Sequence, residues 1–130
     1  MPDSRDLQLK TIHGPENISI SMQGEKPITI GRRPEHDVVL ATGATVSRDH
    51  AAITPQKSGD STIWSLQDNG SRHGTFLNGV RLEAHRSVPL RRGDLIVIEP
   101  FTFQVIDPNE DRNLTQTIDD TLQASGTSIL

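Results

Sequence analysis

Three short stretches of the sequence concentrate arginine, serine, histidine and glycine, the residue types that commonly surround bound oxyanions. They cover residues 31–37, 46–51 and 68–79. Guanidinium groups, hydroxyls and imidazoles donate hydrogen bonds, and arginine keeps its positive charge at every physiological pH. A phosphate dianion accepts hydrogen bonds, so a cluster of such donors suits it. The candidate phosphate-binding residues are Arg32, Ser47, Arg48, Arg72 and His73.

The chain through residue 107 has the pattern of many short β-strands. Apolar residues form short runs, most of them alternating with polar residues, near positions 7–9, 18–22, 28–30, 38–40, 51–53, 63–66, 75–77, 80–82, 95–98 and 101–105. Alternation with a period of two favours strands that bury one face, and no stretch carries a convincing helical stripe. Turn residues separate the runs, for example at 58–60, 69–70 and 78–79. About ten or eleven such strands predict an all-β antiparallel sandwich or barrel.

The predicted sandwich explains how the three stretches could act together. The loops of a sandwich gather at its two ends, and loops held on a rigid scaffold commonly carry function. If the three stretches meet at one end, their arginine, serine and histidine side chains form a single site.

Composition excludes several classes of protein. The chain has 130 residues, with 13 Lys+Arg against 17 Asp+Glu, and its formal net charge is -4. This balance opposes general nucleic-acid binding, which needs a basic surface. The absence of cysteine excludes disulfides and thiolate metal ligands. No secretion signal is visible at the start, and no apolar run approaches the length of a membrane span, so we expect a cytoplasmic protein without membrane contact.

The composition changes at Asp107-Pro108. We expect residues 1–107 to form the folded domain. Residues 108–130 form an acidic, Thr- and Ser-rich tail whose composition predicts disorder, and we expect it to lead to further domains of a longer protein. Three threonines of the tail are candidate phosphorylation sites, Thr115, Thr117 and Thr121. A phosphorylated tail would offer a ligand to its own loops or to a neighbouring copy, whereas a plain interdomain linker is the simpler interpretation.

The same stretches resemble the forkhead-associated (FHA) domain family. The motifs that carry the likeness are Gly31-Arg32, Ser47-Arg48-x-His50, Trp64-x-Leu66-x-Asp68, Ser71-x-x-Gly74-Thr75-x-x-Asn78-Gly79 and Leu90-x-x-Gly93-Asp94. Together they cover about residues 7–106 in the family's order. The resemblance implies an eleven-stranded β-sandwich that binds phosphothreonine peptides and has no catalytic activity of its own.

The resemblance also implies roles for individual candidates. Arg32 would pair with the phosphate, the Ser47 hydroxyl would hydrogen-bond to it, and Arg48 would add a further contact. The alternative interpretations are a surface ion pair for Arg32, a local turn hydrogen bond for Ser47 and a solvated side chain for Arg48. Arg72 would reach the phosphate or the side chains of the peptide.

Other positions of the family pattern would shape the site. These supporting residues are Gly31, His50, Gly74, Thr75, Asn78 and Gly79. The neutral imidazole of His50 can donate to one loop and accept from another, so it would brace the loops from inside. His73 departs from the family, which usually has an asparagine there that hydrogen-bonds the peptide main chain. With histidine there, the preferred peptide sequence or the pH dependence of peptide binding would differ from that of family members with asparagine. The alternative is that the His73 ring only packs within its loop.

Other functions are weighed against peptide binding. Ser47, Asp49 and His50 superficially resemble a hydrolase triad, but residues so close in one stretch rarely converge as nucleophile, orienter and base. The five histidines are scattered, so we expect no enzyme activity, no metal and no cofactor. Phosphate-independent protein binding is the more serious alternative. The expected partner is a threonine-phosphorylated protein, modified by an upstream Ser/Thr kinase in regulatory signalling.

Overall fold

The structure is a computed structural model that describes residues 7–108. The candidate phosphorylation sites Thr115, Thr117 and Thr121 lie outside the described residues. The described chain is all-β, which confirms the predicted fold class. Its strands are β1 (Leu7–His13), β2 (Ser19–Met22), β3 (Ile28–Gly31), β4 (Val38–Val39), β5 (Ala51–Ser58), β6 (Ser61–Asp68), β7 (Phe76–Leu77), β8 (Val80–Arg81), β9 (Val88–Pro89), β10 (Leu95–Ile98) and β11 (Phe101–Ile106).

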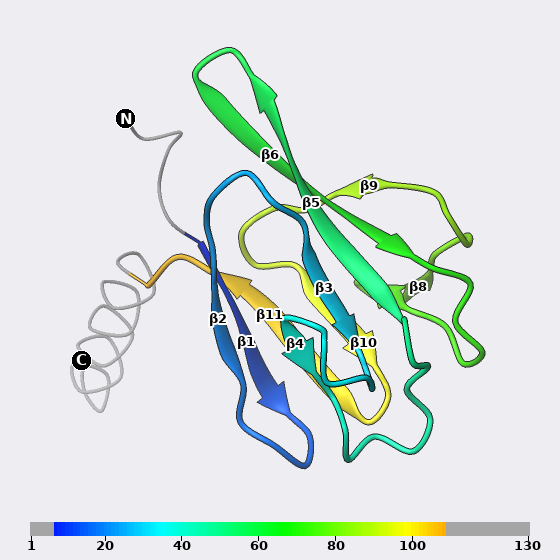
Figure 1. Ribbon diagram of the computed structural model, residues 1–130. Helices are drawn as coiled ribbons and strands as arrows, with labels where there is room; N and C mark the ends of the chain where they lie inside the picture. The colour runs from blue at the N-terminus through cyan, green and yellow to red at the C-terminus, as the bar shows by residue number, and fades with distance from the viewer. Residues whose placement is uncertain (1–6, 109–130) are drawn as a thin grey trace, which may run out of the picture.

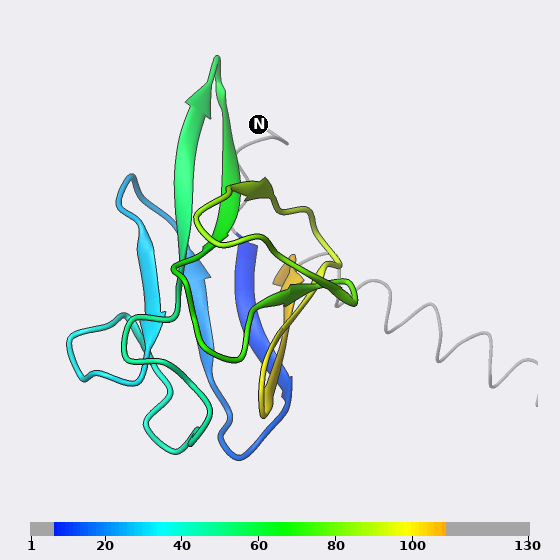
Figure 2. The same ribbon diagram turned by 90° about the vertical axis from the view of Figure 1, so that its right-hand side faces the viewer.

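The strands form two sheets that pack face to face. One sheet has six strands in the order β2-β1-β11-β10-β7-β8, and the other has five in the order β4-β3-β5-β6-β9. Figure 1 shows the two layers, and Figure 2 shows them from the side. All described strand pairs are antiparallel except β3 with β4, which run parallel. The protein is therefore a β-sandwich of mainly antiparallel strands.

The core lies between the sheets because alternate residues of each strand point inward. On β11, Phe101, Phe103 and Val105 are fully buried and alternate with half-buried neighbours. In the other sheet, Ile53 of β5 pairs with Leu66 of β6, and both are fully buried. Each large apolar side chain contributes about 1.5–3 kcal/mol when it leaves water, so these inward faces hold the sheets together.

Turn chemistry sets two of the hairpins. The β7–β8 hairpin turns at Asn78 (φ 51°) and Gly79 (φ 87°), two left-handed residues of the kind that tight hairpins require. The β5–β6 hairpin turns where Ser58 pairs with Ser61, and Gly59 between them has φ 64°. The turns predicted at 78–79 and 58–60 are thus present.

Two features differ from the sequence-based prediction. Asn69-Gly70 lies in the longer loop between β6 and β7 and does not form a two-residue hairpin. Strand β9 has two residues, Val88 and Pro89, that pair with Leu66 and Ser65 of β6. Proline in so short a segment argues against a strand, so only the pairing with β6 reveals β9.

One end of the sandwich carries the stretches of interest. The β3–β4 loop (residues 32–37), the β4–β5 loop (40–50) and the β6–β7 loop (69–75) meet there, and we call this the loop end. In Figures 1 and 2 the β5–β6 hairpin projects at the opposite end from the β3–β4 and β4–β5 loops. Among residues 7–108 there is no helix long and apolar enough to cross a membrane.

Candidate functional site

Arg32 begins the β3–β4 loop and is anchored to the β4–β5 loop. Its backbone N–H lies 3.1 Å from the carbonyl oxygens of both Ser47 and Arg48, and its side-chain Nε donates to the Val46 carbonyl at 3.0 Å. This leaves the two terminal guanidinium nitrogens without a partner in the part of the chain that is described. The ion pair considered as an alternative for Arg32 is not found within residues 7–108.

Gly31 allows this close approach of the two loops. A Cβ atom at this position would lie 2.1 Å from the Arg48 carbonyl oxygen and 2.6 Å from the His36 ring. These separations are far below van der Waals contact, and one of the atoms belongs to the backbone. Glycine therefore sets the distance between β3 and the β4–β5 loop, and with it the position of Arg32.

Arg33 and His36 form a separate network around Asp49. The Asp49 Oδ1 atom lies 3.4 Å from Arg33 Nε and 2.8 Å from His36 Nε2, and His36 Nε2 is also 2.7 Å from the Arg48 carbonyl oxygen. The negative charge of Asp49 is thus engaged by Arg33 and His36. This leaves the Arg32 guanidinium without a carboxylate partner.

His50 braces the β4–β5 and β6–β7 loops from inside. It is 1% exposed, its Nδ1 accepts from the Ser47 backbone N–H at 3.0 Å, and its Nε2 lies 3.0 Å from the Gly74 carbonyl oxygen. Since Nδ1 accepts, the ring proton sits on Nε2 and is donated to Gly74. Burial lowers the pKa of His50 and outweighs the contact with the Gly74 carbonyl, so the neutral ring is favoured.

The hydrogen bonds of His50 also argue against a hydrolase triad. His50 contacts the backbone nitrogen of Ser47, not its hydroxyl, and Asp49 bonds to His36 instead of to His50. A nucleophile and its base would need a direct hydrogen bond between their side chains. The three residues therefore lack the geometry of nucleophile, base and orienter.

Asp68 organises the start of the β6–β7 loop. Its buried carboxylate accepts from the backbone N–H groups of Gly70 and Ser71, both at 3.0 Å, and from the hydroxyls of Ser71 and Thr75. Burial by itself raises the pKa of Asp68, but these hydrogen bonds together outweigh it and hold the pKa below its usual value. An ionised carboxylate thus shapes the loop from within.

Gly74 closes the same loop in a left-handed conformation. Its φ is 91°, its N–H donates to the Ser71 hydroxyl at 3.0 Å, and a Cβ there would lie 2.7 Å from Arg81 Nε. Thr75 follows with a fully buried side chain bonded to Asp68. Together, these contacts set the backbone that carries Arg72 and His73.

A single hydroxyl joins the two halves of the site. Ser47 Oγ accepts the backbone N–H of Arg72 at 3.1 Å, across 25 positions of sequence. Figure 2 shows the β4–β5 and β6–β7 loops next to each other at this point. Because the oxygen accepts here, the hydroxyl proton of Ser47 is left to donate to a ligand. This contact joins two loops, in contrast to the local turn bond considered as an alternative.

The structure thus brings the five candidate residues to one place. The side chains of Arg48, Arg72 and His73 are exposed and have no hydrogen-bond or ion-pair partner within residues 7–108. His73 directly precedes Gly74, whose carbonyl bonds to His50, so it lies one residue from this brace. The loops that carry these three arginines and Ser47 therefore lie together at the loop end.

Asn78 and Gly79 occupy a different place from the other supporting residues. Asn78 Oδ1 accepts from the Leu95 backbone N–H at 2.9 Å, and its Nδ2 donates to Asp94 at 3.1 Å. These contacts fix the β7–β8 hairpin to the start of β10. The hydrogen bonds of the Asn78 side chain thus support the six-stranded sheet and join no residue of the other two loops.

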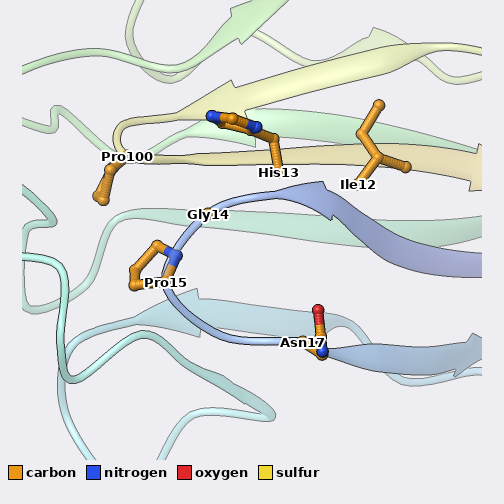
Figure 3. Close-up of a pocket in the computed structure, with 6 residues that line it drawn as sticks. All are labelled: Ile12, His13, Gly14, Pro15, Asn17 and Pro100. Atoms are coloured by element: carbon orange, nitrogen blue, oxygen red, sulfur yellow. The ribbon is translucent and has the colours of Figure 1, made fainter.

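A shallow depression at the β1–β2 and β10–β11 turns is separate from the candidate phosphate-binding site. Its lining residues are Ile12, His13, Gly14, Pro15, Asn17 and Pro100. Figure 3 shows Pro15 and Asn17 on the chain between β1 and β2, with Pro100 in the turn between β10 and β11. The depression shares no residue with the candidate site and contains no arginine or lysine, so it does not suit an anion.

Three functional supports were not among the predicted site residues. They are His36, Asp68 and Ser71, which hold the loops through the contacts described above. The spacing of Asp68, Gly70 and Ser71 is that of an Asx turn, in which the aspartate accepts from backbone N–H groups two and three residues later. That signal was available for Asp68, whereas nothing local in the sequence indicates the long-range contact of His36.

Comparison with known proteins identifies the family. The sequence model of the FHA domain matches residues 28–99. This chain belongs to the FHA domain family. FHA domains are interaction modules, not enzymes. The FHA match spans most of the strands and all three loops of the loop end.

Curated relatives share this FHA domain within much longer chains. An FHA domain-containing protein of Arabidopsis thaliana is 31% identical over 115 residues, which are 85% of this chain and 29% of that protein. An ABC transporter ATP-binding/permease protein of Mycobacterium tuberculosis is 35% identical over 80 residues, which are 59% of this chain and 8% of that protein. This chain thus spans a minor part of these relatives.

Solved structures share the fold. The solution structure of the FHA domain of an Arabidopsis thaliana hypothetical protein has a TM-score of 0.69 at 29% identity and covers 80% of this chain and 86% of that one. Mycobacterium tuberculosis EmbR, in complex with a low-affinity phosphopeptide, has a TM-score of 0.65 at 28% identity and covers 79% of this chain and 24% of that one. Both agree with the FHA sandwich.

Proposed function

We propose that the loop end of this FHA domain binds phosphothreonine in partner proteins and acts as a recognition module in regulatory signalling. The observation that carries the proposal is the geometry of Ser47. Its hydroxyl oxygen accepts from the Arg72 backbone, so its proton is left to donate, and its backbone carbonyl accepts from the Arg32 N–H. A hydroxyl donor in the same loops as unpaired arginines matches the acceptor oxygens of a phosphate.

The charges at the loop end support a dianionic ligand. Arg32, Arg48 and Arg72 have no carboxylate partner within the described residues, while the neighbouring Asp49 is engaged by Arg33 and His36. Charge-assisted hydrogen bonds contribute about 1.5–3 kcal/mol each, so three or four of them give micromolar affinity after ordering costs. The phosphopeptide complex of EmbR, a relative in fold and sequence, supports the same ligand class here.

The partner in this proposal is a protein phosphorylated on threonine by a Ser/Thr kinase. The preference for threonine follows from the resemblance to the family, in which a small apolar slot takes the γ-methyl group. His73, where the family usually has asparagine, is expected to contact the peptide main chain through its ring nitrogens. Arg48 and Arg72 supply the remaining phosphate contacts.

The deciding experiment compares the affinities of the same threonine peptides in phosphorylated and unphosphorylated form. A library of threonine peptides, each synthesised with and without the phosphate, is titrated into the protein and followed by fluorescence anisotropy. We expect binding of phosphothreonine peptides and weak or no binding of the unphosphorylated ones, with phosphoserine analogues weaker than phosphothreonine. Equal affinity with and without phosphate would overturn the proposal and favour a phosphate-independent scaffold.

Arg32 provides the matched mutational test. Arg32→Gln removes a guanidinium that has only a carbonyl partner, and we expect a loss of about 2–5 kcal/mol, which abolishes detectable binding at micromolar affinity. Arg33→Gln removes the same charge one residue later from a side chain already paired with Asp49 and Glu35. Its effect on phosphopeptide affinity should be small. Similar losses in both variants would show that only net charge matters.

A further inference from the structure

Within residues 7–108 the two sheets end in four edge strands, and three of these strands are poorly suited to pair with another strand. Strands β4, β8 and β9 have two residues each, and β8 carries Arg81 while β9 carries Pro89. Short strands, charged side chains and proline all protect an edge against further pairing. Strand β2 has none of these features, because its four residues are uncharged and include no proline. Figure 1 shows this open edge at the border of the six-stranded sheet, beside β1.

The backbone groups of Ser19 and Ser21 point to the open edge of β2. In an antiparallel pair, residues that hydrogen-bond to the partner strand alternate with residues whose N–H and C=O groups point away from it. The Thr11 N–H donates to the Ile18 carbonyl at 2.8 Å, and the register of β1 with β2 places Ile20 in the next hydrogen-bonded pair. The N–H and C=O groups of Ser19 and Ser21 therefore point away from β1, where no strand lies within the described residues.

The side chains of this edge form a pattern that is the same in both directions from Ile20. Ser19 and Ser21 are exposed, whereas Ile18, Ile20 and Met22 pack against the core. When a second copy of β2 lies antiparallel with Ile20 opposite Ile20, Ser19 lies opposite Ser21 of the second copy. Each serine pair then exchanges both of its N–H···O=C hydrogen bonds. In the same register, Ile18 lies opposite Met22 of the second copy, so apolar side chains meet apolar ones.

The acidic residues that flank β2 add no repulsion to this pairing. If the register continues past the ends of the strand, Glu16 lies opposite Gly24 of the second copy, and Glu25 lies opposite Pro15. Like charges directly opposite each other would destabilise a strand pair, and none meet here. The edge is thus complementary to itself in hydrogen bonds, apolar contacts and charge. An unrelated strand would match all three only by coincidence, so a second copy is the occupant that fits.

We propose that β2 is a homodimerisation edge, at which two copies of this chain pair antiparallel about a two-fold axis at Ile20. The interface is isologous, because the same four residues of each copy form it, and it joins the two six-stranded sheets into one. The inference goes beyond the proposed function, since no residue of β2 belongs to the loop end.

The dimer keeps both loop ends accessible. Thr42 of the β4–β5 loop donates to Glu16 in the β1–β2 turn, so β2 starts at the loop end and runs away from it. Figures 1 and 2 show the β1–β2 turn on the same side of the molecule as the β3–β4 and β4–β5 loops. Because the two copies of β2 are antiparallel, the two loop ends point in opposite directions. Each copy can then bind its own ligand.

Sedimentation velocity tests the edge without any peptide. The chain is measured at low salt from about 1 µM to about 1 mM, and we expect a dimer to form as the concentration rises. The dimer should be weak, because such short strands bury less surface than a standard interface. Ser21→Pro removes an N–H that points away from β1, so it leaves the pairing with β1 intact and should weaken dimerisation at least about tenfold.

A pair of charge variants tests the register. Ser19→Glu with Ser21→Glu places like charges opposite each other in the dimer, whereas Ser19→Glu with Ser21→Lys places opposite charges there. In both variants the glutamate at position 19 lies opposite Lys10 of the same copy. We expect the first variant to dimerise at least about tenfold more weakly than the second. Thr54→Glu with Gln56→Glu adds the same charges at exposed positions of β5, and should dimerise about as well as the native chain.

The outcomes decide the inference independently of phosphothreonine binding. Weaker dimerisation in Ser21→Pro and in the variant with two glutamates supports the edge, provided that the mixed-charge variant and the β5 variant still dimerise. Urea unfolding shows that each variant is folded. A native chain that stays monomeric at about 1 mM overturns the inference. A dimer that persists in Ser21→Pro, or one that responds equally to both charge variants, overturns it as well.

Discussion

Ser47 uses one hydroxyl group for two purposes. Its oxygen accepts the Arg72 backbone N–H at 3.1 Å, and this contact joins the β4–β5 and β6–β7 loops. In the proposed function, its proton is donated to a phosphate oxygen of the ligand. A residue that supplies only one of these functions would leave either the loops or the ligand without a partner.

Removal of the Ser47 hydroxyl should weaken phosphopeptide binding. Ser47→Ala loses one charge-assisted hydrogen bond and the contact to Arg72, so we expect affinity to fall about 10- to 100-fold. Ser47→Thr keeps the hydroxyl and should retain most of the binding. Ser58→Ala, at the tip of the β5–β6 hairpin, is the matched control and should bind normally by anisotropy. Normal binding by Ser47→Ala would exclude the hydroxyl from the site.

His50 makes stability depend on pH. Burial lowers the pKa of His50 in the folded protein, whereas the unfolded chain protonates it near the usual value of 6.5. Below that pH the unfolded state binds more protons, so the free energy of unfolding falls as the pH drops, and it is constant above. Protonation at Nδ1 would also oppose the N–H of Ser47.

A comparison of urea unfolding from about pH 8 to about pH 5 tests this role. The native protein should lose up to about 1.4 kcal/mol of stability per pH unit through His50, and His50→Gln should lose less. The quantity compared is the slope of the free energy of unfolding against pH, so the test remains valid if the variant is less stable at every pH. Equal slopes in the two proteins would show that His50 titrates freely in the folded state.

At the scale of structural elements, the β6–β7 loop is built around one buried charge. Asp68, the last residue of β6, holds the N–H groups and hydroxyls of the following turn, and its own carbonyl accepts from the His85 backbone N–H at 2.7 Å. The loop that carries Arg72 and His73 is therefore tied to β6 at one side and to His50 at the other. These hydrogen bonds hold the shape of the β6–β7 loop in the absence of a ligand.

Asp68→Asn should loosen this loop. The amide has nearly the same size but removes the charge and places a donor against other donors, so we expect the free energy of unfolding to fall by about 2–3 kcal/mol. Phosphopeptide affinity should fall with it, measured by urea unfolding and anisotropy. Asp60→Asn, exposed in the β5–β6 turn, is the control and should change stability little.

Asp68 also makes stability depend on pH, in a more acidic range than His50 does. Its hydrogen bonds hold the pKa of Asp68 below the usual 3.8 in the folded protein. Its contribution is therefore complete above that pH and is lost as the pH falls through the lowered pKa. If Asp68→Asn and the native protein lose stability equally as the pH falls, the Asp68 carboxylate is not ionised in the folded loop.

The whole molecule has a negative net charge, but unpaired positive charge is concentrated at the loop end. The chain carries a formal charge of -4, yet three arginines without ion pairs in the described structure share the loop end. In the proposed function, the attraction for a phosphopeptide comes mainly from these three arginines of the loop end. The sandwich contributes by holding three separate loops at fixed distances through its buried core.

This charge arrangement predicts salt dependence. The dissociation constant for a phosphothreonine peptide should rise several-fold as salt increases from about 50 mM to about 500 mM, because exposed ion pairs are screened. Double-stranded DNA should bind weakly at either salt concentration, because the net negative charge opposes an extended polyanion. Anisotropy with labelled peptide and labelled DNA measures both. Affinity that is independent of salt would indicate a contact dominated by apolar groups.

Local patterns in the sequence were sufficient for the fold class and for most strands. Alternation along β11 and turn residues such as Asn78-Gly79 act over a few positions, so they can be recognised without neighbours. The five candidate site residues also came from local motifs and from the resemblance. Strand β9 was not predicted because it pairs a single apolar residue with a proline, which argues against a strand.

The contacts that assemble the site were decided by the tertiary structure. The Ser47 bond to Arg72 and the His36 contact to Asp49 join residues that are 25 and 13 positions apart in the chain. Such contacts depend on strand register and on how closely two loops approach, and no local pattern encodes either. Sequence could therefore indicate which side chains are candidates for an anion site, whereas the packing of the two sheets determined that the loops that carry them lie together.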